Sequence, residues 1–323
     1  MRPIRVNGTT VEVLDQRILP IREKWVRIGS YEDAYNAIKT MVVRGAPLIG
    51  VVAAFGLALT DPNKNLDEAA SRLKSARPTA VNLAWAVDRV LKASKGSRDP
   101  GVAFSEALNI FNEELESARM IGENGEKFFS DNDSVLTHCN AGALATVDYG
   151  TALAPIRVAR EKGKNLRLYA TETRPVMQGA RLTSYELLKD GFDVTLIADT
   201  AVGYTMRCGR ITKVIVGADR VLSDGTTINK IGTFQVATMA KKFNIPFYVA
   251  LPSSTLDLQS KLEDVKIEER DSSELTQIRG RRTAPKGIKV FNPAFDITPP
   301  DLISAIITEK GVYYHPFNFK MGP

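Results

Sequence analysis

The sequence contains very little cysteine and histidine. Its two cysteines are Cys139 and Cys208, and its two histidines are His138 and His315. Two cysteines in 323 residues are too few for a disulfide framework and fit a reducing compartment, so we expect a cytoplasmic protein. The two histidines show no paired-ligand spacing, and we therefore predict no metal site.

Long apolar runs and the common nucleotide-binding motifs are absent as well. No apolar stretch approaches the roughly 20 residues that cross a membrane, and Met1–Arg5 leads into polar sequence rather than a secretory signal. Neither a G-x-x-x-x-G-K-[ST] nor a G-x-G-x-x-G loop is present, which leaves nucleotide binding with little support. Ser253–Thr255 lacks a nucleophile elbow and an obvious histidine partner, so we do not expect a serine hydrolase.

The chain is moderately basic, with a net charge of +6 and a pI near 9.2. Its densest basic segment is Arg279–Arg282, followed by Lys286 and Lys289. Such a short run is more typical of a solvated or subunit-contacting loop than of a nucleic-acid surface. We therefore expect no nucleic-acid partner and no membrane partner, whereas a positive excess suits a small, negatively charged substrate.

Residues 1–129 are expected to form a hairpin and a helical domain. Strands at residues 4–6 and 11–14 flank Asn7-Gly8, a strong turn signal. Apolar residues at helical spacing then predict five helices. They cover residues 31–43, 47–59, 67–74, 81–91 and a long segment that starts at Asp99-Pro100.

Residues 130–323 have a different pattern, in which short apolar strands alternate with helices. The strands are expected at residues 134–137, 166–170, 194–198, 213–216 and 247–251. This alternation predicts βαβ units and a parallel sheet, and hence an α/β protein with two domains. We also predict a helix over 229–243, a polar loop over 272–286 and a last helix from 298 to about 311.

Reactive side chains follow several of these strands, where ligands of open parallel sheets usually bind. Cys139 comes after one strand and before an expected helix, whose N-terminus would favour the thiolate. Asp219 ends another strand, and apolar neighbours there would raise its pKa and make it a proton donor. A buried structural cysteine and a turn-capping aspartate remain alternatives. His138 should point away from Cys139, because neighbours in an extended segment face opposite sides.

Two further segments could bind an anion. Arg44-Gly45-Ala46-Pro47 joins a forked cation to a close-approach glycine and a helix N-terminus, which attracts phosphate. A plain loop-to-helix junction explains the same residues equally well. Asn229-Lys230 could bind phosphate or sugar hydroxyls, although Asn229 could equally cap the next helix.

Taken together, these segments resemble the methylthioribose-1-phosphate isomerase family. That family shares a superfamily with ribose-1,5-bisphosphate isomerases and with the regulatory subunits of a translation initiation factor's nucleotide-exchange factor. The resemblance covers nearly the whole chain. Its motifs are Leu14–Gln16 with Leu19-Pro20, Arg44–Gly50, Arg77–Leu83, Thr137–Gly142, Glu172–Thr183, Gly217–Arg220, Asn229–Thr233, Ile267–Asp271 and Asn292–Pro299.

The resemblance implies a homodimer with a helical N-terminal domain and a Rossmann-like C-terminal domain. It implies conversion of 5-methylthioribose 1-phosphate to 5-methylthioribulose 1-phosphate without a cofactor. Cys139 and Asp219 would be the catalytic pair, and the substrate contacts would be Arg44, Gly45, Ala46, Arg77, Gln178, Asn229 and Lys230. A ribose-1,5-bisphosphate isomerase and a non-catalytic regulatory subunit remain the alternatives. The former tends to differ from this chain at Arg44–Gly50, Asn140–Gly142 and Gln178–Thr183.

Overall fold

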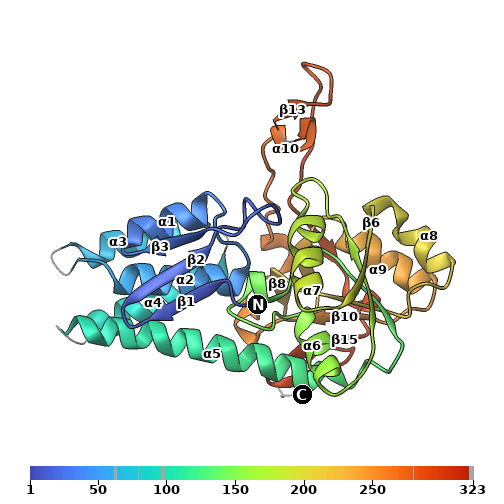
Figure 1. Cartoon of the computed structure of the whole chain (residues 1–323), viewed down its shortest axis with the longest axis horizontal. Helices are drawn as coiled ribbons and strands as arrows, with labels where there is room; N and C mark the ends of the chain where they lie inside the picture. Colours follow the sequence, from blue (N-terminus) through green and yellow to red (C-terminus); the bar gives the residue numbers. More distant parts are fainter. Residues whose placement is uncertain (62–63, 79, 96–98, 279, 320–323) are drawn as a thin grey trace.

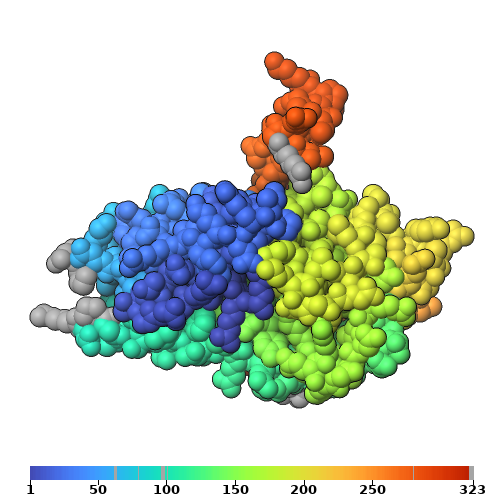
Figure 2. Space-filling view, in the orientation of Figure 1, coloured from blue at the N-terminus to red at the C-terminus, as the bar shows by residue number. Residues whose placement is uncertain are grey.

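The computed structural model describes residues 1–61, 64–78, 80–95, 99–278 and 280–319. Thr79, within the motif Arg77–Leu83, and Arg279, in the basic segment, lie outside the described residues. The chain forms two lobes that share the long helix α5 (Pro100–Glu126), and an arm projects from the larger lobe (Figures 1 and 2).

The smaller lobe contains the N-terminal sheet and helices. The predicted hairpin is confirmed as β1 (Ile4–Asn7) and β2 (Thr10–Leu14), and β3 (Trp25–Ile28) adds an antiparallel strand that was not predicted. Three of the four β3 residues are partly or fully exposed, so no alternation of buried and exposed positions marks it. Four helices follow this sheet before α5, and the first two of them contact β3. They are α1 (Tyr31–Lys39), α2 (Ala46–Ala58), α3 (Leu66–Lys74) and α4 (Val81–Lys95).

Helix α2 is the centre of this lobe, as its almost wholly apolar sequence predicted. Residues 47–57 are all buried, and α2 packs against α1, α4 and α5. Helix α5 then joins the lobes, because Ala107 and Ile110 belong to the smaller lobe's core and Ile121 to the core of the larger. The two cores therefore meet along one helix, which fixes the position of one lobe against the other.

The larger lobe is built on a seven-stranded sheet that is parallel except for its last strand. Its spatial order is β16-β15-β10-β7-β4-β5-β6, with only β16 antiparallel to its neighbour. Helices α6 (Leu153–Glu161), α7 (Ser184–Lys189), α8 (Val202–Arg207) and α9 (Thr233–Lys242) connect or cover the strands. The strands are β4 (Ser134–Thr137), β5 (Arg167–Thr171), β6 (Asp193–Ile197), β7 (Lys213–Val216), β10 (Phe247–Ala250), β15 (Ala305–Thr308) and β16 (Gly311–Tyr313). The predicted α/β class and Rossmann-like parallel sheet are confirmed.

A second, smaller sheet and the arm lie beside the main sheet. The small sheet has the order β11-β8-β9-β14, with β8 (Arg220–Leu222) and β9 (Thr227–Lys230) directly after β7. Strands β11 (Leu256–Asp257) and β14 (Phe295–Thr298) complete it. The arm carries the short helix α10 (Ser273–Thr276) and a short antiparallel pair of strands, β12 (Gln277–Ile278) and β13 (Arg281–Arg282). A polar loop was predicted for this segment.

One helix prediction in this lobe is wrong, and a second is confirmed with a later start. The segment expected to be a last helix forms a 3₁₀ turn at Pro300–Leu302 and then the strands β15 and β16. Ala305–Thr308 is completely buried beside β10, and β-branched residues suit such a strand. The helix predicted over 229–243 begins at Thr233, because Asn229 and Lys230 pair with β14 and Gly232 starts the helix in a left-handed conformation.

Candidate active site

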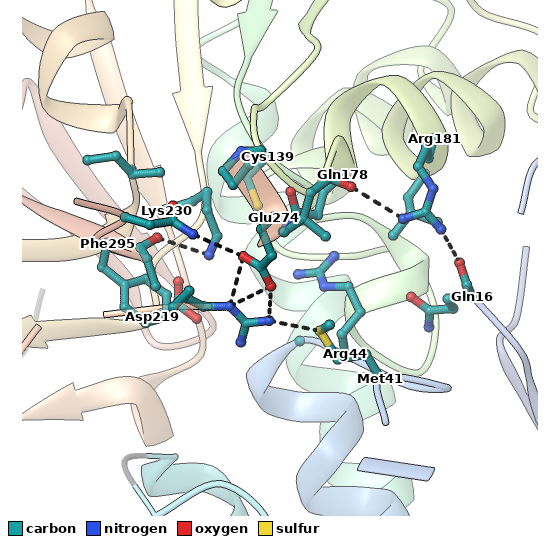
Figure 3. A pocket seen from close by; sticks show the side chains of 18 of the residues that line it. Gln16, Met41, Arg44, Cys139, Gln178, Arg181, Asp219, Lys230, Glu274 and Phe295 are labelled. Carbon is teal, nitrogen blue, oxygen red and sulfur yellow. Dashed lines mark hydrogen bonds and ion pairs between the residues drawn. The ribbon is translucent and has the colours of Figure 1, made fainter. Parts of the chain in front are cut away.

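A pocket of about 280 Å³ opens between the lobes at the carboxyl ends of the parallel strands. Figure 3 shows Lys230 and Asp219 on one side, Gln16 and Arg181 on the other, and Cys139 and Gln178 between them. The smaller lobe contributes the segment before α2, and the larger lobe contributes segments that follow β4, β5, β7 and β9. This is the edge at which ligands of open α/β sheets bind.

The structure brings all of the predicted site residues together. The pocket is lined by Arg44, Gly45, Arg77, Cys139, Gln178, Asp219 and Lys230. Ala46 and Asn229 line a smaller cavity of about 40 Å³, which shares Arg44, Gly45, Cys139 and Asp219 with the larger one. The sulfur and the carboxyl thus face the same space, although their positions are far apart in the chain.

Cys139 is held tightly by its backbone. Its N–H donates to the Thr173 hydroxyl at 3.0 Å, and its carbonyl accepts from the Thr183 hydroxyl at 2.6 Å. Its φ of 63° lies in the left-handed region, which is uncommon for a residue with a side chain and frequent at functional sites. The thiol is therefore fixed in place at the pocket wall.

The expectation of a favoured thiolate is wrong. Cys139 is 8% exposed, and burial raises its thiol pKa, although the charges of Arg44 and Lys230 act in the opposite direction. No α-helix begins directly after it, because a 3₁₀ turn at Ala143–Ala145 follows and α6 starts at Leu153. The helix-terminus effect that the sequence indicated is consequently missing.

Asp219 lies in the short connection between β7 and β8. Its backbone N–H donates to the Ile228 carbonyl at 3.0 Å, which fixes the turn. The expected apolar enclosure is wrong, because the residue is exposed to the pocket space. Its carboxyl group is therefore free to meet a ligand.

Three cations of the pocket have no carboxylate ion pair in the part of the chain that the structure describes: Arg181, which donates only to backbone carbonyls, and the pair Arg44 and Lys230. Arg44 donates to the side chain and backbone oxygens of Asn140 at 2.5 and 2.9 Å. Lys230 donates to the Ala294 carbonyl at 3.0 Å, with its ammonium 4.4 Å from the centre of the Phe295 ring. Burial lowers the pKa of Lys230, while the nearby Cys139 and Asp219 oppose that shift. Arg44 and Lys230 are thus available to an anionic ligand.

The other predicted contacts occupy distinct positions. Arg77 lies 3.7 Å from the carboxylate of Glu268. Gln178 is 7% exposed, and its Oε1 has no hydrogen-bond partner among the described residues. Asn229 donates to the Thr233 hydroxyl at 3.0 Å, while Gly232 and not Asn229 precedes the helix.

His138 is not paired with Cys139, as predicted. Its ring contacts the Thr171 hydroxyl at 2.7 Å and the Ile231 carbonyl at 2.9 Å. Burial lowers its pKa, which favours the neutral ring. His138 therefore has a structural role: its ring joins the end of β4 to β5 and to the segment after β9.

Several pocket residues were not singled out from the sequence, although most lie in the segments that carry the resemblance. They are Gln16, Arg17, Met41, Arg181, Arg270, Glu274 and Phe295. Arg181 donates to the backbone carbonyls of Gln16 and Arg17 at 2.7 and 3.0 Å. These bonds connect the helical turn Gly179–Thr183, which precedes α7, to the smaller lobe. Such contacts join positions more than 160 residues apart and leave no signal in local spacing.

Neither a metal centre nor a membrane span is found in the described ranges. No group of three or more His, Cys, Asp or Glu side chains there is arranged to hold a metal ion. None of the described helices is long and apolar enough to cross a membrane.

Comparison with known proteins places the chain among close relatives. A methylthioribose-1-phosphate isomerase of Thermosipho africanus is 51% identical over 96% of this chain and 94% of its own length. One of Acetivibrio thermocellus is 48% identical over 98% of each chain. The crystal structure of 5-methylthioribose 1-phosphate isomerase from Pyrococcus horikoshii has a TM-score of 0.92 at 39% identity, covering 99% of this chain and 94% of that one.

A translation factor subunit is similar as well. The crystal structure of translation initiation factor eIF-2B subunit delta from A. fulgidus has a TM-score of 0.88 at 43% identity, covering 100% of this chain and 98% of that one. The profile of the initiation factor 2 subunit family matches residues 42–315. With this match and relatives near 50% identity over almost the full length, the chain belongs to the initiation factor 2 subunit family.

Proposed function

We propose that the chain is an aldose-ketose isomerase that converts 5-methylthioribose 1-phosphate to 5-methylthioribulose 1-phosphate in methionine salvage. One observation carries the proposal: the thiol of Cys139, the carboxyl of Asp219 and the unpaired cations Arg44 and Lys230 face one pocket. The relatives named methylthioribose-1-phosphate isomerase, which are 48 and 51% identical, support the same substrate.

The phosphate would bind where the cations meet a helix N-terminus. Arg44, Arg77 and Lys230 supply positive charge, and α2 begins at Ala46 directly after Gly45. The free N–H groups and the dipole of a helix start favour phosphate. Gln178 and Asn229 would then contact the sugar hydroxyls.

The reaction is difficult because the anomeric oxygen carries the phosphate and the ring cannot open to a free aldehyde. Asp219 would protonate the ring oxygen as its bond to C1 breaks. A hydrogen must then move from C2 to C1, while the 2-hydroxyl loses its proton to the Asp219 carboxylate and becomes the ketone. One carboxyl group thus gives a proton and takes one back.

Two routes exist for the hydrogen. A Cys139 thiolate could take the C2 proton and leave an enol phosphate, which is then protonated at C1. Alternatively, a hydride moves directly from C2 to C1, and Cys139 only shapes the site. We infer the hydride route, because burial raises the pKa of the Cys139 thiol and so disfavours the thiolate that the first route requires. Solvent deuterium at C1 of the product would contradict this inference.

The test is an assay of purified protein with both sugar phosphates. We expect turnover of 5-methylthioribose 1-phosphate, and a loss of about 10²–10⁴-fold in Asp219→Asn, the size typical of a lost acid–base group. Cys208→Ser is the control, because Cys208 is exposed and absent from the pocket lining. A higher kcat/KM for ribose 1,5-bisphosphate than for 5-methylthioribose 1-phosphate would identify the chain as a ribose-1,5-bisphosphate isomerase instead. No turnover of either substrate would favour the regulatory subunit.

We also propose that the protein is a homodimer of the cytoplasm, with domains at residues 1–129 and 130–323. The low cysteine content supports a reducing compartment. Light scattering of the full chain tests the dimer, and a monomer across the working concentration range would contradict it.

A further inference from the structure

We propose that Glu186 is a positioning residue that sets the direction of Arg44 and thereby the affinity for phosphate. It acts through Asn140 and the active-site loop, residues 139–143. The inference rests on the proposed function, because it assumes that Arg44 binds the phosphate of the substrate.

Glu186 lies on α7, behind the pocket wall, and its side chain is completely buried. Its Oε1 accepts from the Asn140 side-chain amide at 2.5 Å. Its Oε2 accepts from the backbone N–H of Ala143 at 2.7 Å and from Arg157 at 2.8 Å. Glu186 therefore clamps the active-site loop at two points, one after Cys139 and one at the loop's end.

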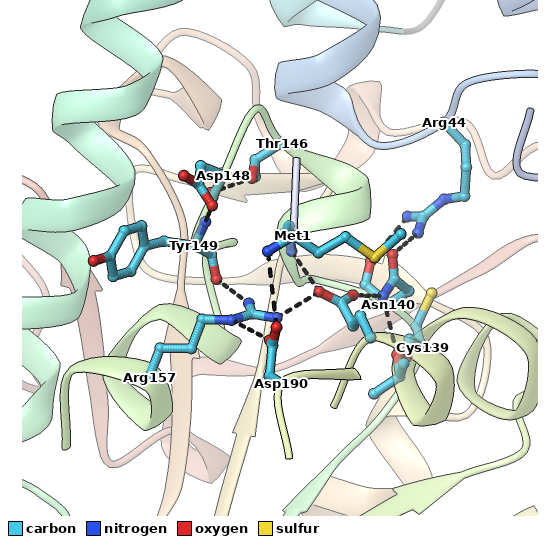
Figure 4. Close-up of polar contacts among 12 residues, drawn as sticks. Met1, Arg44, Cys139, Asn140, Thr146, Asp148, Tyr149, Arg157 and Asp190 are labelled. Carbon is cyan, nitrogen blue, oxygen red and sulfur yellow. Dashed lines mark hydrogen bonds and ion pairs between the residues drawn. The ribbon is translucent and has the colours of Figure 1, made fainter. Parts of the chain in front are cut away.

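The Asn140 side chain passes this constraint to Arg44, as Figure 4 shows for the two residues. Its NH₂ group is occupied by Glu186 and by the Thr183 hydroxyl at 3.1 Å, so its Oδ1 must face the other way. That oxygen and the Asn140 carbonyl both accept from Arg44. Two parallel bonds fix the plane of a guanidinium group. The carboxylate thus determines the amide's orientation, and the amide determines the guanidinium's.

Arg157 supplies a positive charge beside the buried carboxylate of Glu186. It lies 2.8 Å from Glu186 and 2.5 Å from Asp190, and its side chain is 10% exposed (Figure 4). A buried carboxylate without such a partner is strongly unfavourable. Asp190 shares Arg157 with Glu186, but among the described residues its carboxylate pairs with Arg157 and the N-terminus and not with the active-site loop, so it offers a matched control.

Gly142 gives an independent way to move the same carboxylate. A Cβ added to Gly142 would lie 2.2 Å from Oε1 of Glu186. Alanine at this position would therefore push the carboxylate away without changing any charge. Because the φ of Gly142 is −102°, alanine causes no backbone strain of its own.

The experiment measures KM, kcat and the binding of inorganic phosphate by calorimetry. Glu186→Gln replaces one acceptor oxygen by an NH₂ group that faces other donors, so the clamp is lost on one side. We expect KM and the phosphate Kd to rise about 10-fold or more, as for a weakened charge-assisted hydrogen bond, with a smaller change in kcat. Gly142→Ala should give the same pattern. Asp190→Asn should leave KM and phosphate Kd within about twofold, because Arg157 keeps its bonds to Glu186 and to the Tyr149 carbonyl, and Glu186 keeps its bonds to Asn140 and Ala143.

Unchanged KM and phosphate affinity in Glu186→Gln and Gly142→Ala would overturn the proposal, as would an equal rise in Asp190→Asn. If Glu186→Gln does not fold, Gly142→Ala still decides. The phosphate titration separates this proposal from the proposed function. Wild-type protein without isomerase activity would refute the proposed function. The phosphate titration would still show whether Glu186 sets the direction of the Arg44 side chain.

Discussion

A Cβ added to Gly45 would lie 2.3 Å from the backbone oxygen of Ala145. The two residues come from different lobes, since Gly45 precedes α2 and Ala145 belongs to the turn after the active-site loop. Gly45 also has a φ of 93°, which residues other than glycine rarely adopt. The pocket therefore depends on a backbone contact that leaves no space for any side chain.

We expect Gly45→Ala to be severely destabilising. The backbone conformation of Gly45, with φ 93° and ψ 132°, is one that residues with a Cβ rarely adopt and costs about 1–3 kcal/mol, and the clash with Ala145 additionally forces the backbones apart. Gly8→Ala is a matched control, because Gly8 has a φ of 57° but no atom within 4 Å of the added Cβ. Chemical denaturation should show a loss near 1 kcal/mol for Gly8→Ala and a clearly larger one for Gly45→Ala. Equal losses would mean that the close contact is not present in solution.

The charges around Cys139 predict opposite effects of two substitutions on its thiol. Burial raises the thiol pKa, Arg44 lowers it and Asp219 raises it. Arg44→Met should therefore move the pKa of Cys139 further up, and Asp219→Asn should move it down. The pH dependence of alkylation measures both shifts, in a Cys208→Ser background so that one thiol reacts. Shifts in the same direction would show that the reacting thiol does not sense these two groups.

Local sequence was sufficient to place Cys139 and Asp219 at one edge of the sheet, whereas Arg77 and Gln178 were expected there only from the family resemblance. Cys139 and Asp219 follow β4 and β7, which are neighbours in the sheet, so the carboxyl ends of these strands bring them to one edge. Their environments were not predictable in this way. Cys139 is buried whereas Asp219 is exposed, and this difference depends on the contacts of distant parts of the chain rather than on local spacing.

The fold shows the same division. The apolar run of α2 and the turn signal at Asn7-Gly8 are strong, and both the helix and the hairpin formed, although Asn7 ends β1 and the turn itself is Gly8-Thr9. The segment after Pro300 did not form the predicted helix. Its residues form the strand β15 because they pair with β10, which lies more than 50 residues earlier in the chain. The arm, where the sequence is polar and basic, forms short elements whose pattern is too brief to recognise.

A buried carboxyl group outside the pocket should make the stability of the protein depend on pH. Glu114 on α5 is 7% exposed, and burial raises its pKa from 4.5 to about 8, with Glu309 and Glu113 adding to the effect. In the unfolded chain the group ionises near its ordinary value. Between these two pKa values the folded state binds more protons than the unfolded state, so stability falls as the pH rises through this window.

Glu114→Gln removes this ionisation while keeping the shape of the side chain. We expect the variant and the wild type to unfold with similar free energies well below pH 4.5, because Glu114 is then neutral in both the folded and the unfolded chain. Above about pH 8 the variant should be more stable, by on the order of a few kcal/mol, since ionised Glu114 is no longer forced into the interior. Urea denaturation across this pH range measures the difference. Glu116→Gln, at an exposed position of the same helix, should leave the pH profile of the wild type unchanged. A constant difference between Glu114→Gln and wild type at all pH values would mean that Glu114 has the same pKa in the folded and unfolded chain.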